Sequence, residues 1–168
     1  MQSQHASVVS GAIAGLVGTA PMTAVMRAAW EALPEHERYP APPRQIIDRT
    51  SGGAQTATLL AHFGYGALCG AMFAASGRRS VADGVLFGLG VWGASYLGIL
   101  PSLRVLRSGT THPPRRTGMM LAAHAMWGAA TALALRDLER ASRTLFDEGP
   151  ALDAPRSAIA SANGRQRD

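Results

Sequence analysis

The feature that most constrains this chain is a set of four uncharged apolar stretches whose short motifs recur in its two halves. The recurring residues of the first and third stretches are Ser7, Gly11 and Gly15, matched by Ser80, Gly84 and Gly88. The motif Pro42-Pro43-Arg44 recurs as Pro113-Pro114-Arg115. The second and fourth stretches share Ala61, His62, Tyr65 and Gly66, matched by Ala123, His124, Trp127 and Gly128. A duplicated helical hairpin predicts a pseudo-symmetric membrane bundle with a site between its repeats.

Each stretch is long enough to cross a bilayer. Histidines aside, residues 6–26, 51–77, 84–103 and 117–135 contain no charged side chain, and a membrane helix needs about 20 predominantly apolar residues. The alternative is a water-soluble four-helix protein, whose helices would carry a charged stripe with a period of 3.6 residues. No such stripe is present, so the predicted fold is an all-α integral membrane four-helix bundle built from two parallel two-helix repeats.

Helix signals set the predicted boundaries. The first helix is expected over residues 7–30 with Pro21 inside it, and the second ends near Ser76. Ser80 and Asp83 have the spacing of a capping box that starts the third helix, which Pro101 ends. The fourth helix is expected from Thr117 to about residue 140. The four-span domain thus covers residues 1–140, with repeats at 7–76 and 80–136, and the polar segment 147–168 is predicted to be disordered.

The charge pattern indicates a lipid surface rather than nucleic acid as the partner. The net charge is +5, and all 16 basic residues are arginines. They flank the apolar stretches, where arginines contact anionic headgroups and set topology. The predicted headgroup contacts are Arg44, Arg104, Arg107, Arg115 and Arg116. The arginine bias favours cytoplasmic Pro-Pro-Arg loops, with both termini outside.

Enzyme signatures are missing from the sequence. There is no nucleophile elbow, no zinc-protease motif and no phosphate loop, so no catalytic residue is predicted. The single cysteine, Cys69, excludes an internal disulfide and a thiolate metal cluster. We therefore expect a protein that is not an enzyme and holds no metal in a dedicated cluster.

Glycine pairs spaced four residues apart are predicted to pack the helices, because they allow close backbone approach. These residues are Gly11, Gly15, Gly66, Gly70, Gly84 and Gly88. A glycine-lined groove for a flat cofactor or a lipid tail is the alternative interpretation.

The two histidines inside apolar stretches, His62 and His124, are the sharpest candidates for a polar site. Ionisable residues at depth usually face the bundle interior and mark function. Three roles are open: structural hydrogen bonds between helices, handling of protons or substrate, or ligation of a metal or of haem b. Tyr65 and Trp127 follow the histidines by three residues and share their helix faces. All four side chains are expected to line one interior.

The glycine-rich first helix, the Pro-Pro-Arg loop and the Ala-His-x-x-x-Gly motif at Ala123 resemble the YagU-like family of small bacterial inner-membrane proteins. The resemblance covers residues 7–136 and implies a multi-pass protein of the bacterial inner membrane, without a known reaction. The expected function is that of a non-enzymatic transporter-like or sensor bundle, or of an accessory subunit of a larger complex. A homo-oligomer is a further expectation. The alternative is a haem- or quinone-binding redox subunit that uses His62 and His124.

Overall fold

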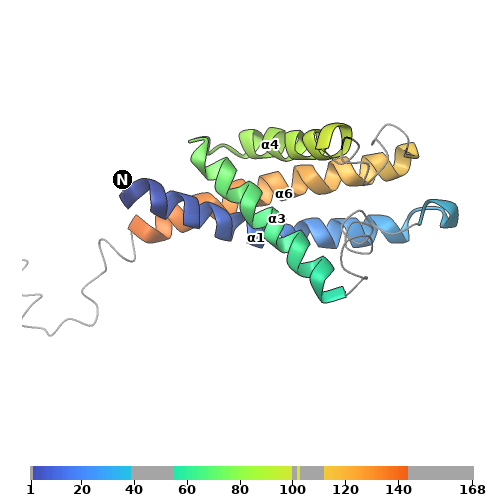
Figure 1. Cartoon of the computed structure of the whole chain (residues 1–168), viewed down its shortest axis with the longest axis horizontal. Helices are drawn as coiled ribbons and strands as arrows, with labels where there is room; N and C mark the ends of the chain where they lie inside the picture. The colour runs from blue at the N-terminus through green and yellow to red at the C-terminus, as the bar shows by residue number, and fades with distance from the viewer. Residues whose placement is uncertain (1, 39–54, 100–101, 103–111, 144–168) are drawn as a thin grey trace, which may run out of the picture.

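The chain folds into a bundle of four long helices, seen in a computed structural model that describes residues 2–38, 55–99, 102 and 112–143 (Figure 1). The elements are α1 (Gln2–Glu31), the short 3-10 helix η1 (Glu35–Glu37), α3 (Gln55–Ala75), α4 (Val81–Gly93), the π-helical segment η2 (Ala94–Ile99) and α6 (Pro114–Ala141). The described residues include no strand. The predicted all-α four-helix bundle is confirmed.

Local sequence explains where the helices begin. The Ser80 hydroxyl accepts a hydrogen bond from the Asp83 amide at 3.0 Å, so the predicted capping box does start α4. The first helix starts five residues earlier than expected, at Gln2. The fourth starts three residues earlier, at Pro114, because a proline at the first helical position lacks only an amide that would be unpaired anyway.

The third helix differs from the prediction in its second half. A regular α-helix was expected up to Leu100, whereas the structure changes to π-helical geometry at Ala94. Such π-segments inside helices are uncommon and often mark functional sites. Leu100 itself, the loops with Pro42 and Arg104, and the segment 147–168 lie outside the described residues.

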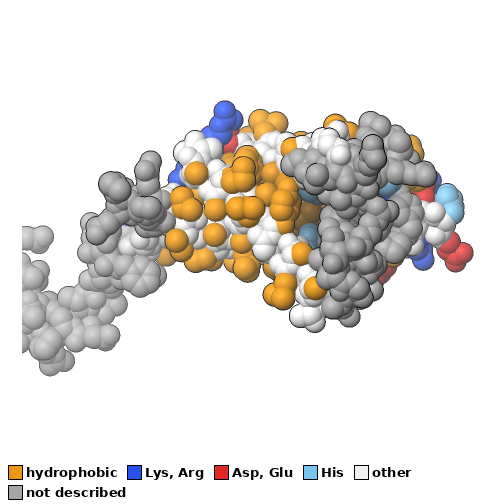
Figure 2. Space-filling model, viewed as in Figure 1, with side chains coloured by type: hydrophobic (Ala, Val, Ile, Leu, Met, Phe, Trp, Pro, Cys, Tyr) orange, Lys and Arg blue, Asp and Glu red, His pale blue; other side chains and the backbone are white. Residues whose placement is uncertain are grey.

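All four helices are long and apolar enough to cross a membrane. The candidate spans are Ser7–Glu31, Thr56–Ala75, Val81–Gly98 and Pro114–Ala141. On the face shown in Figure 2, apolar side chains form a band across the described part of the bundle, while Lys, Arg, Asp and Glu colours lie toward its two ends. This distribution suits a bilayer, whose core excludes charge.

The helices form an open series rather than a closed ring. Helices α1 and α6 pack against each other at the centre, α3 packs on α1, and α4 packs on α6, whereas α3 and α4 barely touch. Figure 1 shows α3 crossing α1 obliquely while α4 runs along α6, with the start of α1 and the end of α6 at the same end of the bundle. We call the boundary between α3 and α4 the open seam.

Glycines make the contacts within each hairpin. Side chains at Gly15 and Gly70 would overlap the backbone of the facing helix, because Gly15 lies against the Gly66 carbonyl and Gly70 against that of Gly11. In the second hairpin, Gly88 lies against the His124 carbonyl in the same way. The helices therefore approach backbone to backbone, as small residues allow in membranes.

The two hairpins pair in different registers. Gly15 faces Gly66 in the first hairpin, and the sequence motifs match these residues with Gly88 and Gly128. In the structure, the carbonyl against Gly88 is that of His124, four residues before Gly128. Four residues are about one helical turn. The second hairpin is thus displaced by one turn relative to an exact copy of the first.

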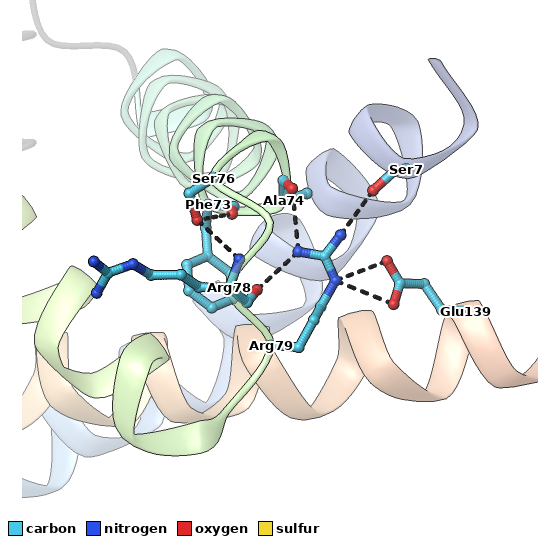
Figure 3. Close-up of polar contacts among 7 residues, drawn as sticks. All are labelled: Ser7, Phe73, Ala74, Ser76, Arg78, Arg79 and Glu139. Carbon is cyan, nitrogen blue, oxygen red and sulfur yellow. Dashed lines mark hydrogen bonds and ion pairs between the residues drawn. The ribbon is translucent and has the colours of Figure 1, made fainter. Parts of the chain in front are cut away.

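Arg79 ties three helices together where α3 turns into α4 (Figure 3). Its Nε lies 2.9 and 3.1 Å from the two carboxylate oxygens of Glu139 on α6. Its other nitrogens donate to the Ser7 hydroxyl on α1 at 3.0 Å and to the Ala74 carbonyl on α3 at 3.1 Å. The turn is possible because Gly77 adopts φ +73°, a left-handed conformation that suits glycine. One arginine therefore fixes this end of the bundle.

Candidate functional site

His124 lies in the middle of α6 and is only 7% exposed. Its Nδ1 is 2.8 Å from the carbonyl oxygen of Met120, one turn earlier. A carbonyl can only accept, so Nδ1 carries the hydrogen and donates. Among the described residues no hydrogen-bond partner is present for Nε2. Because a charged ring is costly to bury among apolar side chains, the neutral ring with a lone pair on Nε2 is favoured.

His62 approaches the same region from α3 and is partly buried. Its Nε2 is 3.4 Å from the hydroxyl oxygen of Thr23 on α1. That hydroxyl already donates to the Thr19 carbonyl at 2.7 Å, so His62 is the donor in this long contact. The lone pair of His62 is consequently on Nδ1. Each imidazole thus offers one unshared nitrogen.

The two histidines have different partners. His62 reaches the Thr23 hydroxyl of α1, whereas His124 contacts the Met120 carbonyl of its own helix and the Tyr96 ring of η2. Each hairpin thus supplies one imidazole to the apolar part of the bundle, and no contact between the two rings is present among the described residues.

Aromatic rings surround His124. The ring of Tyr96, on η2, meets it edge to face with centroids 6.3 Å apart. Trp92 stacks on Tyr96 with centroids 5.9 Å apart. The π-helical segment therefore supplies the ring that closes this side of the histidine, which the sequence-based expectation of a regular helix did not include.

Trp127 and Tyr65, matched in the sequence motifs, have different surroundings. Trp127 is 3% exposed, and its indole N–H donates to the Gly15 carbonyl of α1 at 3.0 Å. Tyr65 is 47% exposed, and its hydroxyl lies 2.9 Å from the Ser95 hydroxyl of η2. Tyr65 therefore does not line the interior as expected. Its hydroxyl instead reaches Ser95 across the open seam, because α3 is a peripheral helix that packs mainly on α1.

The arginines predicted to contact headgroups also differ in their exposure to solvent. Arg115 is exposed at the start of α6. Arg116 is 2% exposed, donates to the Glu37 carbonyl at 3.0 Å and lies 5.4 Å from the centre of the Trp30 ring. The expectation that Arg116 contacts headgroups is therefore wrong, since a backbone carbonyl and an aromatic face satisfy its charge inside the protein. Arg44, Arg104 and Arg107 lie outside the described residues.

A further group beside the histidines was not predicted from the sequence. Four methionines, two on α1 and two on α6, lie in adjoining core clusters: Met22, Met26, Met119 and Met120. We call them the methionine column. Met26 packs against both clusters, one of which contains Cys69 and the other Tyr96. The signal available in the sequence was their spacing, since Met22 and Met26 are one turn apart, as are Met120 and His124.

Comparisons with protein-family models, with curated proteins and with solved structures give no match for this chain. The resemblance to the YagU-like family consequently stays a prediction. Function has to be argued from the interior around the histidines.

Proposed function

We propose that the protein is a non-enzymatic, transporter-like bundle of the bacterial inner membrane that passes protons through its interior at His62 and His124. One observation carries the proposal: two imidazoles from different hairpins lie within the candidate spans, buried or partly buried, and each keeps one ring nitrogen without a partner among the described residues. Polar rings at this depth are costly, and membrane proteins retain them mainly along ion and proton pathways.

The surroundings of the histidines supply groups that can pass a proton on. Thr23 contacts His62, and the hydroxyls of Tyr65 and Ser95 form a pair at the open seam. Hydroxyls both donate and accept, so they can relay a proton between imidazoles and bound water. The path runs beside the open seam, where α3 and α4 pack only loosely on each other.

The test is proton flux into liposomes that contain the purified full chain and a trapped pH-sensitive dye, driven by a potassium diffusion potential. We expect His124→Gln, which keeps a polar side chain but cannot titrate, to reduce the flux at least about tenfold. His62→Gln should act in the same direction. The matched control is His36→Gln in η1, whose side chain is 79% exposed. Flux equal to that of protein-free liposomes, or equal in His124→Gln and wild type, would refute the proposal.

His62 and His124, each with one free ring nitrogen, also fit a second candidate function, that of a haem- or quinone-binding redox subunit. Two imidazoles can ligate one haem iron. An absorption spectrum of the purified protein separates the two. A Soret band that is lost in both His62→Ala and His124→Ala would replace the proton path by a haem site. A spectrum without such a band, combined with histidine-dependent flux, favours the proton path.

Membrane location and topology are tested separately in bacterial cells. With four spans, both ends of the bundle domain share one compartment. Reporter fusions after Ser76 and after Arg140 should therefore report the same side, and a fusion at Pro42 the other. Fractionation should place the chain in the inner membrane. Different sides for Ser76 and Arg140 would rule out four spans.

A further inference from the structure

A cluster of buried apolar side chains separates the histidines from the end of the bundle where α3 turns into α4. The cluster takes its members from α1, α3 and α6, and Phe87 of α4 packs against it. On both α3 and α6, its residues follow the histidine in the direction of that end. We call it the apolar plug: Ala14, Phe73, Ala74, Ala132 and Leu135. A path from the histidines to this end of the bundle has to pass the apolar plug.

Arg79 closes over the apolar plug from the turn (Figure 3). It donates to the carbonyl of Ala74, a member of the plug, at 3.1 Å. Glu139, whose carboxylate oxygens lie 2.9 and 3.1 Å from the Arg79 Nε, follows Leu135 of the plug by one helical turn. The third partner, the Ser7 hydroxyl at 3.0 Å, is on α1. One guanidinium thus contacts each of the three helices that form the plug.

The contact between α3 and α4 near the turn is weak. The rings of Phe73 and Phe87 meet there with centroids 5.3 Å apart and planes tilted by 50°, and the two helices pack only loosely on each other. The close backbone contacts of α3, at Gly66 and Gly70, are with α1 instead. Release of Arg79 therefore frees the end of α3, and Phe73 with it, while both glycine contacts stay in place.

We propose that Arg79 and Glu139 form a latch that keeps the apolar plug closed, and that release of this latch opens the interior around the histidines to water. The latch controls the path of the proposed function, and so it rests on that function for what passes through the plug. Closure of the plug is measured without proton flux, so failure of the flux test and failure of the latch are distinguishable.

Cys69 reports on the plug in the unmodified chain. It is the only cysteine of the sequence, is 5% exposed, and lies one turn before Phe73 on the histidine side. The experiment follows its reaction, in liposomes that contain the full chain, with a small charged methanethiosulfonate that does not enter lipid. We expect labelling at least about tenfold faster in Arg79→Gln than in wild type, because loss of a tie raises the population of the locally opened state. Cys69→Ser should not be labelled.

The neighbouring arginine is the matched control. Arg78 forms an exposed ion pair with Asp83 at 3.4 Å, so Arg78→Gln should label as wild type does. Exchange of the two charges separates the latch from a loss of folding. Arg79→Glu places a second carboxylate beside Glu139 and should label fastest, because like charges repel. Combined with Glu139→Arg, which restores opposite charges, it should label at least about tenfold more slowly than Arg79→Glu alone.

The latch is refuted if Arg79→Gln and Arg78→Gln label equally, or if the exchanged pair labels as fast as Arg79→Glu. In the flux assay, Arg79→Gln should raise proton flux, and the addition of His124→Gln should remove the increase. Histidine-dependent flux with unchanged labelling of Cys69 in Arg79→Gln would keep the proton path and reject the latch. Faster labelling without any flux would keep the latch and reject the proton path.

Discussion

The two hairpins of this bundle use the same small-residue contacts but place their histidines differently. In the α1–α3 hairpin, the histidine is on a peripheral helix and is partly exposed, whereas in the α4–α6 hairpin it is on a central helix and is buried. The reason is that α1 and α6 pack together while α3 and α4 barely do. In two hairpins related by a twofold axis, those two boundaries would be equivalent. Matched motifs therefore do not guarantee matched environments.

The difference has a chemical consequence. Trp127 and Tyr65 occupy matched positions, and the first donates to a backbone carbonyl in the tight α1–α6 boundary while the second reaches a hydroxyl across the open seam. The α1–α6 boundary is held by close backbone approach and by the buried ring of Trp127. The open seam is joined by the rings of Phe73 and Phe87, whose centroids are 5.3 Å apart, and by the hydrogen bond between Tyr65 and Ser95, and its helices do not approach backbone to backbone as those of the hairpins do. We therefore expect the open seam to be the part of the bundle that separates most easily.

The largest effect should come from filling the glycine contacts. Gly15→Leu places a side chain against the Gly66 carbonyl, and Gly88→Leu does so against His124. Because backbone cannot yield as a flexible side chain does, we expect each to reduce stability by about 3 kcal/mol or more. Thermal unfolding in detergent measures this.

Each hairpin contains its own control for the glycine substitutions. Gly64 on α3 and Gly90 on α4 have no neighbouring atom within 4 Å of an added Cβ. Gly64→Leu and Gly90→Leu should therefore leave the unfolding temperature nearly unchanged. If Gly15→Leu is as mild as Gly64→Leu, the close α1–α3 contact does not exist in the membrane protein.

A smaller effect should follow from removing Arg79, which joins both hairpins. Arg79→Ala loses the contacts with Glu139, Ser7 and Ala74. Because the ion pair is partly exposed to solvent, its loss should cost only about 1–2 kcal/mol. The neighbouring Arg78→Ala breaks an exposed pair with Asp83 and should produce no measurable change in the same unfolding assay. Equal effects of the two substitutions would show that Arg79 is not the tie between hairpins.

The smallest effects come from two substitutions that compare the α1–α6 boundary with the open seam. Trp127→Phe removes the buried indole donor to Gly15, at an expected cost of about 1 kcal/mol. Tyr65→Phe removes the hydroxyl at the open seam, where the ring is half exposed, and should cost about 0.5 kcal/mol. A cost for Tyr65→Phe above that for Trp127→Phe would mean that the seam is closed more firmly than the α1–α6 boundary.

The helices and their local contacts can be predicted from the order of the amino acids alone. Uncharged stretches of bilayer length gave the four spans, and the Ser80–Asp83 spacing gave the start of α4. Glycine spacing placed Gly11 and Gly15 at a helix contact. These features are predictable because they depend on residues one or two helical turns apart, whose relation is fixed by helix geometry.

The environments of the matched residues depend instead on how the four helices pack together. The one-turn difference in register, the burial of Arg116, the exposure of Tyr65 and the π-helical segment around Tyr96 all depend on which helices become central. The methionine column is of the same kind, since Met26 of α1 packs on the core cluster that holds Met119 and Met120 of α6 only because these two helices pack together. Helix packing decides whether a side chain contacts a neighbouring helix or lipid. Both environments accept the same apolar sequence.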